Sequence, residues 1–184
     1  TQEIQRKDTR VKEVILLAHT FTGCDSSSSI FGKGKLTGYK LPLTGNLESA
    51  IKVFTKRNSS QEAVRDAGNE IFSAMYSLPD NVQLNKFCFP LYAHLGQTSR
   101  KIDLRLLCPT QGAAMQHSLR VYCQVQAWLG NNLSITDWGW KLEDNIFSPV
   151  MSNDPLLPPD LLKTLYCGCK KCCTANCGCR KNGI

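Results

Sequence analysis

The sequence predicts a mainly helical domain that carries a small β-hairpin and is followed by a cysteine-rich knot. Several segments repeat apolar residues at the spacing of one helix face. One short segment, from Trp138 to Val150, alternates apolar and polar residues around a polar turn. Six of the ten cysteines fall between Cys167 and Cys179. These patterns divide the chain into a helical domain at 1–153, a proline-rich linker with a short helix at 154–166, and a knot at 167–184.

The composition is that of a globular protein. Its 184 residues are 42% hydrophobic and 20% charged, which is enough for one main domain with a buried core. The longest apolar run, Val14 to Ala18, falls short of the roughly 18 residues that span a bilayer, so we expect no membrane segment. The chain begins at Thr1 without a signal-peptide pattern and ends at Ile184 inside a cysteine-rich stretch, so we expect a fragment of a longer protein.

The formal net charge of +7 suits an acidic partner such as nucleic acid. An excess of this size is about as common on a solvated surface that binds nothing. The charge therefore permits a nucleic-acid partner without requiring one.

The N-terminal part of the chain combines an apolar segment with a polar loop. Residues 10–19 fit either a helix or a strand. Residues 22–35 contain four consecutive serines together with glycines and lysines, which is typical of a turn-rich connection.

Three helices are predicted in the middle of the domain. Asn46 can cap the first helix, and Ser59 with Glu62 forms a capping-box pattern for the second. Pro90 would kink the third. Their expected ranges are 46–57, 59–78 and 82–95.

The strongest helical pattern begins after Pro109 and ends at Leu129, where Gly130 stops it. Trp138 and Trp140 follow at strand spacing. We expect these rings to pack the hairpin on the domain, because large aromatic side chains dominate burial, although aromatic rings beside basic groups also stack on bases.

The cysteine tail predicts a zinc site. Closely spaced thiolates let one short segment supply several ligands to a tetrahedral zinc ion. The other four cysteines lie singly in apolar or loop contexts, which indicates a reducing, intracellular compartment rather than disulfides, and we expect the nucleus. The predicted zinc ligands are Cys167, Cys169, Cys172, Cys173, Cys177 and Cys179.

Six thiolates allow two arrangements. One is a single four-sulfur site with two spare thiols, and the other is a pair of zinc ions that share bridging sulfurs, with further ligands beyond Ile184. Four basic residues would offset the excess negative charge of the thiolates, and the tail contains no acidic residue. These basic residues are Lys170, Lys171, Arg180 and Lys181.

The tail, CGCKKCCTANCGCRKNGI, resembles the tesmin-like CXC family, whose cysteine-rich repeats bind zinc and, in several members, DNA. The resemblance covers residues 167–184, and the second cysteine set of such repeats would lie past the end of this chain. It implies a structural zinc and a DNA partner. A knot that is purely structural, or that binds a protein, is the alternative.

The segment LLAHTFTGCDSSSSIFGKGK resembles the part of the flap-endonuclease family in which a metal-binding aspartate precedes a helix-hairpin-helix element. The resemblance implies a helix-hairpin-helix-like segment at 10–45, with Asp25 as a Mg²⁺ ligand. Hard Mg²⁺ prefers carboxylate oxygens, and glycines let backbone amides approach a phosphate. The nucleic-acid-binding residues would be Gly32, Lys33, Gly34 and Lys35. In the alternative, Asp25 is a turn residue and the glycines only allow the chain to turn within a loop.

The order of motifs along nearly the whole chain is similar to a set of uncharacterised proteins associated with mobile elements. The motifs are His-x-x-Thr-Gly-Cys-Asp at 19–25, Phe-Gly-Lys-Gly-Lys at 31–35, His-Ser-x-Arg at 117–120, Trp-Gly-Trp at 138–140 and the cysteine cluster. This similarity implies a family without naming an activity.

These features give one leading hypothesis: the chain is a zinc-binding, nucleic-acid-associated C-terminal part of a divergent flap-endonuclease-like or mobile-element-derived protein. A two-metal nuclease needs several converging carboxylates, so the chain holds no complete active site, and a metal-dependent, structure-specific nuclease would require the full-length protein. The alternatives are a non-enzymatic, zinc-dependent protein-interaction module and a decayed mobile-element product.

Overall fold

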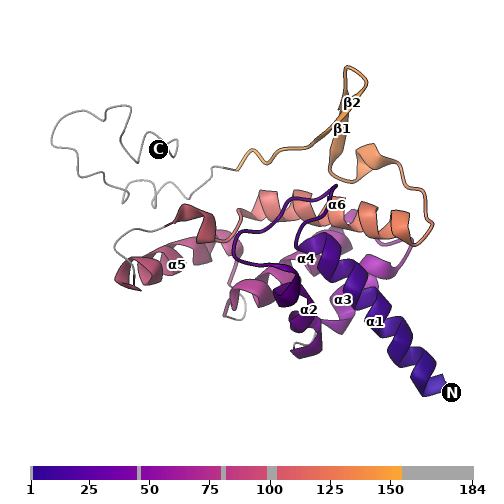
Figure 1. Ribbon diagram of the computed structural model, residues 1–184. Helices are drawn as coiled ribbons and strands as arrows, with labels where there is room; N and C mark the ends of the chain where they lie inside the picture. Colours follow the sequence, from indigo (N-terminus) through magenta and orange to yellow (C-terminus); the bar gives the residue numbers. More distant parts are fainter. Residues whose placement is uncertain (1, 45–46, 80–81, 99–102, 155–184) are drawn as a thin grey trace.

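The computed structural model describes residues 2–44, 47–79, 82–98 and 103–154. Figure 1 shows a mainly helical body with one two-stranded antiparallel sheet, which confirms the coarse prediction. The predicted linker helix and zinc knot lie outside the described residues. The elements are α1 (Gln2–Phe21), α2 (Lys35–Thr44), α3 (Glu48–Thr55), α4 (Gln61–Tyr76), α5 (Leu84–Thr98), α6 (Gln111–Trp128), β1 (Trp140–Glu143) and β2 (Ile146–Pro149), with short 3₁₀ turns at Leu104–Leu106 and Ile135–Asp137.

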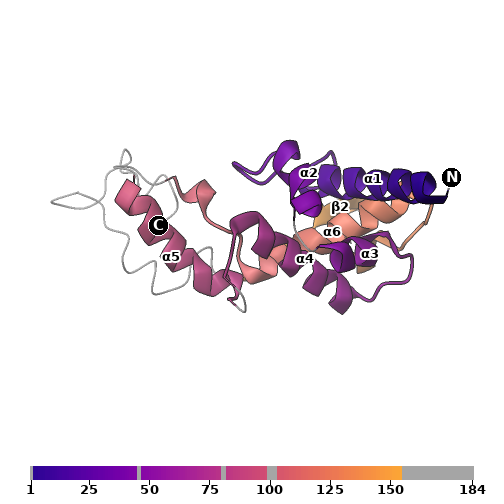
Figure 2. The same ribbon diagram turned by 90° about the horizontal axis from the view of Figure 1, so that it is seen from below.

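Helix α6 lies at the centre of the helical body. Seen from below in Figure 2, it runs between α1 and α3, and it packs against both of them and against α4. Helix α5 extends away from the other helices in both views, while the hairpin stands above α6 in Figure 1. Among the described helices, none combines the length and apolar character that crossing a bilayer requires.

The apolar segment at 10–19 is a helix and not a strand. It belongs to α1, whose buried positions Val14, Leu17, Ala18 and Phe21 follow helical spacing. The chain leaves the helix at Gly23, which has a φ of +107° and lies so close to Ser29 that a Cβ would come within 2.6 Å of its Cα. Only glycine tolerates both conditions.

The start of α4 corrects the predicted capping box. The N-cap is Ser60, whose Oγ accepts a hydrogen bond from the Ala63 N–H at 3.1 Å. Ser59 instead donates its hydroxyl proton to the Val53 carbonyl at 2.7 Å and so belongs to the end of α3. Asn46, the predicted cap of α3, lies outside the described residues. Helix α5 continues through Pro90.

The hairpin is confirmed, with a shorter first strand than expected. Trp138 closes the preceding 3₁₀ turn, and β1 begins at Trp140. Asp144 and Asn145 have φ values of 50° and 60°, as the two-residue turn of a tight hairpin requires. Trp138 packs on the Tyr122 ring at a centroid distance of 4.4 Å, which confirms its predicted packing role.

Helices α4 and α6 cross at Gly68 and Ser118. A Cβ on Gly68 would lie 1.9 Å from the Ser118 Oγ and 2.5 Å from its Cβ. The Ser118 hydroxyl is held in place because it donates to the Ala114 carbonyl at 2.8 Å. The absence of a side chain at residue 68 therefore sets how closely the two helices approach.

Buried polar side chains of α6 bind the end of α3 and the residues that follow it. The Tyr122 hydroxyl lies 2.6 Å from the Arg57 carbonyl and 2.8 Å from the Lys56 carbonyl, and it accepts from the Ser59 N–H. Gln126, whose side chain is fully buried, donates to the Phe54 carbonyl at 2.8 Å. These bonds supply partners to carbonyls that a helix C-terminus leaves without one.

His117 supplies a hydrogen-bond partner to the last carbonyl of α1. Its Nε2 lies 2.9 Å from the Phe21 carbonyl, and its ring packs edge-on against the Phe21 ring. Burial lowers the pKa of His117 to about 4, against a smaller opposing effect of the hydrogen bond to Phe21; the charge of Arg120 lowers it further. The imidazole is therefore neutral at pH 7, with its proton on Nε2.

We expect the Gly68→Ala substitution to destabilise the fold by about 1–3 kcal/mol, because the new methyl group overpacks the α4–α6 crossing. In an open helix the same change stabilises by about 0.5–1 kcal/mol, so the sign of the effect is diagnostic. Urea unfolding followed by circular dichroism measures it. Glu70→Ala, on the exposed side of the same helix, is the control and should change stability by less than about 0.5 kcal/mol. An equal or more stable Gly68→Ala protein would contradict the packing described.

Stability should fall as the pH drops from 6.5 toward 4 because of His117. Its pKa is lower in the folded than in the unfolded chain, so the unfolded state binds more protons in this window. The contribution is fully present above pH 6.5, and about 3 kcal/mol is lost by pH 4. Urea unfolding at several pH values should show a shallower pH dependence for His117→Gln than for the parent. Gln97→Ala, at an exposed position, changes no titratable group and should retain the parent slope. Equal slopes for parent and His117→Gln would refute this assignment.

Candidate functional site

The predicted metal-binding aspartate lies at the tip of a tight turn between α1 and α2. Cys24 and Ser27 exchange two backbone hydrogen bonds of 3.1 and 3.2 Å, which leaves Asp25 and Ser26 as the turn. The Asp25 side chain is exposed. Ser26 points back to α6, where its hydroxyl donates to Gln124 Oε1 at 2.5 Å. The turn is thus anchored to α6 beside Asp25.

Cys24 lies within the same turn as a partly exposed free thiol. Burial opposes its ionisation, but hydrogen bonds from the hydroxyl and backbone groups of Ser26 and Ser27 outweigh that effect and lower the pKa of the thiol. Both hydroxyls also have other acceptors, since Ser27 donates to the Thr20 carbonyl at 2.5 Å. The pKa of Cys24 is lowered most when the hydroxyls of Ser26 and Ser27 donate to its sulfur atom instead of to these acceptors.

The glycine- and lysine-rich stretch before α2 is folded back on the domain. Gly32 has a φ of +71° in a turn closed by the Lys33 N–H and the Ile30 carbonyl. The Lys33 amine lies 4.9 Å from the centroid of the Tyr76 ring. Lys35 donates to the carbonyls of His19 and Gly23. The two predicted phosphate-binding lysines therefore make contacts within the domain.

Gly34 is where α2 begins, since its carbonyl accepts from the Gly38 N–H at 3.1 Å. It is exposed, and a Cβ there would meet nothing within 4 Å. Gly38 is tightly packed, because a Cβ would lie 2.5 Å from Thr22 Cγ2 and 3.2 Å from the Ala18 carbonyl. Close contact between α1 and α2 thus requires glycine at 38 and not at 34.

The structure places all five predicted residues of this segment on one connection, residues 22–34, and at the start of α2. Within the described part of the chain, Asp25 forms no hydrogen bond or ion pair with Gly32, Lys33, Gly34 or Lys35. The described residues also contain no group of three or more His, Cys, Asp or Glu that could hold a metal ion. The predicted zinc ligands, Cys167 to Cys179, lie outside the described residues.

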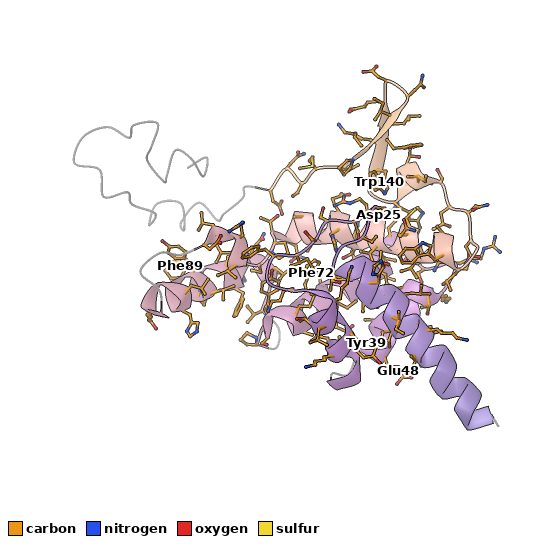
Figure 3. The ribbon with its side chains drawn as sticks, viewed as in Figure 1. Asp25, Tyr39, Glu48, Phe72, Phe89 and Trp140 are labelled. Carbon is orange, nitrogen blue, oxygen red and sulfur yellow. The ribbon has the colours of Figure 1, made fainter. Side chains whose placement is uncertain are left out.

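A cavity of about 450 Å³ opens on the other side of this turn, between α6 and the hairpin. Figure 3 shows Asp25 beneath the strand that carries Trp140. One face of α6 forms the cavity floor, with Arg120, Cys123, Gln124 and Ala127 at helical spacing. The remaining lining residues are Ser26, Asn131, Asn132, Leu133, Ile135, Trp140 and Phe147.

Arg120 provides the charge of this cavity. Its side chain is only 9% exposed, and its Nη1 donates to the carbonyls of Gly139 and Val150, both at 3.4 Å. Burial lowers the pKa of the guanidinium, which stays charged at neutral pH. No carboxylate among the described residues pairs with Arg120, and its other two nitrogens bind no described residue. Nε and Nη2 are not among the buried polar atoms that lack a partner, so they are open to the cavity that Arg120 lines.

Two motifs noticed in the sequence converge at this point. Arg120 ends the His-Ser-x-Arg motif, and Gly139 is the centre of Trp-Gly-Trp. Gly139 has a φ of +81°, and a Cβ there would lie 3.0 Å from the Gln116 carbonyl and 3.1 Å from Arg120 Cγ. The motif therefore keeps glycine where the hairpin base touches α6. The order of these motifs was visible in the sequence, but their meeting in a cavity was not.

Two of the four cysteines that were expected to lie singly are in contact. Cys88 of α5 and Cys108, just before α6, are both buried, and their sulfur atoms are 3.0 Å apart. The Cys108 thiol lies 3.4 Å from the Leu84 carbonyl, to which it donates. All four described cysteines are free, as predicted.

Comparisons with known proteins return no match: no protein-family model, no curated protein and no solved structure is similar to this chain.

Cys24 should be the most reactive of the four described cysteines. The pKa of Cys123 is raised by burial, whereas that of Cys24 is lowered, and Cys88 and Cys108 are buried. We expect iodoacetamide at pH 7.5 to alkylate Cys24 faster than Cys123, because the thiolate is the reactive form and the lowered pKa gives Cys24 the larger thiolate fraction. Peptide mass spectrometry over time measures both rates. Faster labelling at Cys123 would contradict the turn geometry.

Proposed function

We propose that this chain is a zinc-binding module that associates with nucleic acid in the nucleus. The observation that carries the proposal is the tail at 167–184, which holds six cysteines and four basic residues and no acidic residue. Thiolates at such spacing are typical of structural zinc sites. Zinc would bring the basic residues of the tail together into one positively charged surface, which attracts phosphate.

The rest of the chain supports an acidic partner. Outside the tail the formal net charge is +3, because the four basic residues of the tail account for the rest of the +7 of the whole chain, and the guanidinium of Arg120 faces a cavity without a carboxylate among the described residues. The start of α2 adds exposed backbone at Gly34, where the first N–H groups of a helix have no partner within the helix. A nucleic acid would meet positive potential on several elements of the chain.

The proposal for this chain is binding and not catalysis. Asp25 is exposed and could contribute one carboxylate to a Mg²⁺ ion. Two-metal phosphodiester hydrolysis needs several carboxylates that converge on the metals. The described residues offer no such group, so the flap-endonuclease-like hypothesis requires ligands from elsewhere in a longer protein.

A zinc-dependent protein-interaction module is the second candidate, and the exposed apolar side chains of the hairpin favour it. Ile146 is 68% exposed, and Leu142 and Met151 are also exposed. Leu142 and Ile146 lie on opposite faces of the hairpin and Met151 follows it, and exposed apolar groups on a projecting element are common at protein interfaces. A partner protein would cover this surface when bound.

The purified, reduced chain should contain at least one zinc ion per molecule by atomic emission spectroscopy. Cys169→Ser and Cys172→Ser should each lower the zinc content, because each removes a thiolate ligand. Cys123→Ser, in the helical domain, is the matched control and should leave it unchanged. A zinc content below one per molecule in the parent chain would overturn the metal assignment.

Single-stranded and flapped DNA should bind with an affinity that falls steeply with salt, because phosphate contacts release counterions. Fluorescence anisotropy between about 50 and 200 mM NaCl measures the slope, which is expected near −0.7 per phosphate contact on a single strand. Asp25→Ala should leave binding unchanged or slightly tighter, since a carboxylate repels phosphate. The absence of binding at low salt would refute the nucleic-acid proposal and favour the protein-interaction module.

A further inference from the structure

We propose that the cavity between α6 and the hairpin binds a single nucleotide unit, which is a planar base that carries a phosphate. This inference deepens the proposed function by giving it a defined binding pocket. It uses only described residues, so it does not depend on zinc in the tail. A cavity of about 450 Å³ lies within the usual range of small-ligand pockets.

The charge of Arg120 points to the phosphate. A guanidinium carries N–H donors on every nitrogen, and among the described residues only Nη1 of Arg120 finds partners, both of them long contacts to carbonyls. A buried charge of this kind is costly unless an opposite charge or strong hydrogen bonds compensate it. The planar fork of arginine fits two oxygens of a phosphate group. An anion in the cavity would therefore supply the negative charge and the hydrogen-bond acceptors that no described residue provides to Nε and Nη2 of Arg120.

The aromatic residues of the cavity point to the base. Strand pairing sets Trp140 opposite Pro149 and Leu142 opposite Phe147, so Trp140 and Phe147 share one face of the hairpin. Both line the cavity, and Phe147 is 50% exposed although it is a large apolar ring. Bases stack on such rings with little regard to sequence. The hairpin face thus offers a stacking surface above the floor that carries Arg120.

Amide side chains complete the pocket. Gln124, Asn131 and Asn132 line the same space. The Gln124 Oε1 accepts from Ser26, and its NH₂ group has no partner among the described residues, whereas the Asn131 NH₂ group donates to Gln126 Oε1. Oriented amides of this kind hydrogen-bond the edges of bases.

A base with a phosphate is present both in a free mononucleotide and in one unit of a single strand, so either could occupy the cavity. Calorimetric titration of the 184-residue chain with adenosine monophosphate, adenosine and inorganic phosphate tests the first source. Anisotropy with a labelled single-stranded oligonucleotide tests the second. Adenosine monophosphate should bind more tightly than either adenosine or phosphate, because each of these lacks one of the two recognised groups. Binding by the oligonucleotide alone would assign the pocket to a strand.

The decisive pair of variants is Phe147→Ala and Ile146→Ala. The two residues are neighbours on β2 and are both exposed, but their side chains lie on opposite faces of the hairpin. Loss of one stacking contact should weaken binding of adenosine monophosphate or of the oligonucleotide by at least about fivefold in Phe147→Ala, while Ile146→Ala stays within about twofold of the parent. Arg120→Lys should weaken binding of the monophosphate more than binding of adenosine, and its thermal unfolding reports any loss of the hairpin base.

The outcomes separate this inference from the function proposed above. If neither ligand binds, or if Phe147→Ala and Ile146→Ala weaken binding equally, the nucleotide pocket is refuted. Salt-dependent DNA binding that survives in both variants would then keep the nucleic-acid proposal and place it on the tail. Binding of an acidic peptide in place of the nucleotide, with the same sensitivity to Phe147→Ala, would also overturn the inference.

Discussion

The buried hydrogen-bond donors of α6 are the constraint on which the rest of the structure depends. His117 serves the last carbonyl of α1, Tyr122 and Gln126 serve the carbonyls at and after the end of α3, and Arg120 serves the base of the hairpin. A buried carbonyl that loses its partner costs about 1–3 kcal/mol, so each bond favours one position for the element that it holds. The glycine at position 68 lets α4 approach the same helix closely. One central helix thus fixes where four other elements end or cross.

This arrangement also explains why the cavity is where it is. Arg120 has two roles, because its Nη1 binds the hairpin base while its other nitrogens remain without partners among the described residues. The face of α6 that continues from Arg120 to Ala127 becomes the cavity floor, and the hairpin that Arg120 holds becomes its aromatic wall. Because Ser26 donates to Gln124, the turn at residues 24–27 lies at the edge of the cavity. Structure and proposed binding therefore use the same side chain.

Local patterns were enough to predict much of the fold. Helical spacing, glycine stops and the Asp144–Asn145 turn identified the main helices and the hairpin. The capping residue of α4 was misplaced by one position because Ser59 and Ser60 both suit a cap, and only the contact of Ser59 with Val53 separates them. Lys33 and Lys35, which the flap-endonuclease resemblance implies as phosphate-binding residues, contact Tyr76 and the end of α1, and no local pattern indicated these contacts. The cavity joins residues 26, 120 and 147, and no local spacing could show that they meet.

The cavity between α6 and the hairpin is proposed to bind one nucleotide of a nucleic acid. Chemical-shift mapping of the isotope-labelled chain during titration with a single-stranded oligonucleotide tests this claim most directly. The largest amide shifts are expected at Trp140 and Phe147, together with shifts of the Arg120 side-chain resonances and of α6 from Arg120 to Ala127. Shifts confined to the exposed sides of α3 and α4, with the hairpin and Arg120 unchanged, would contradict it.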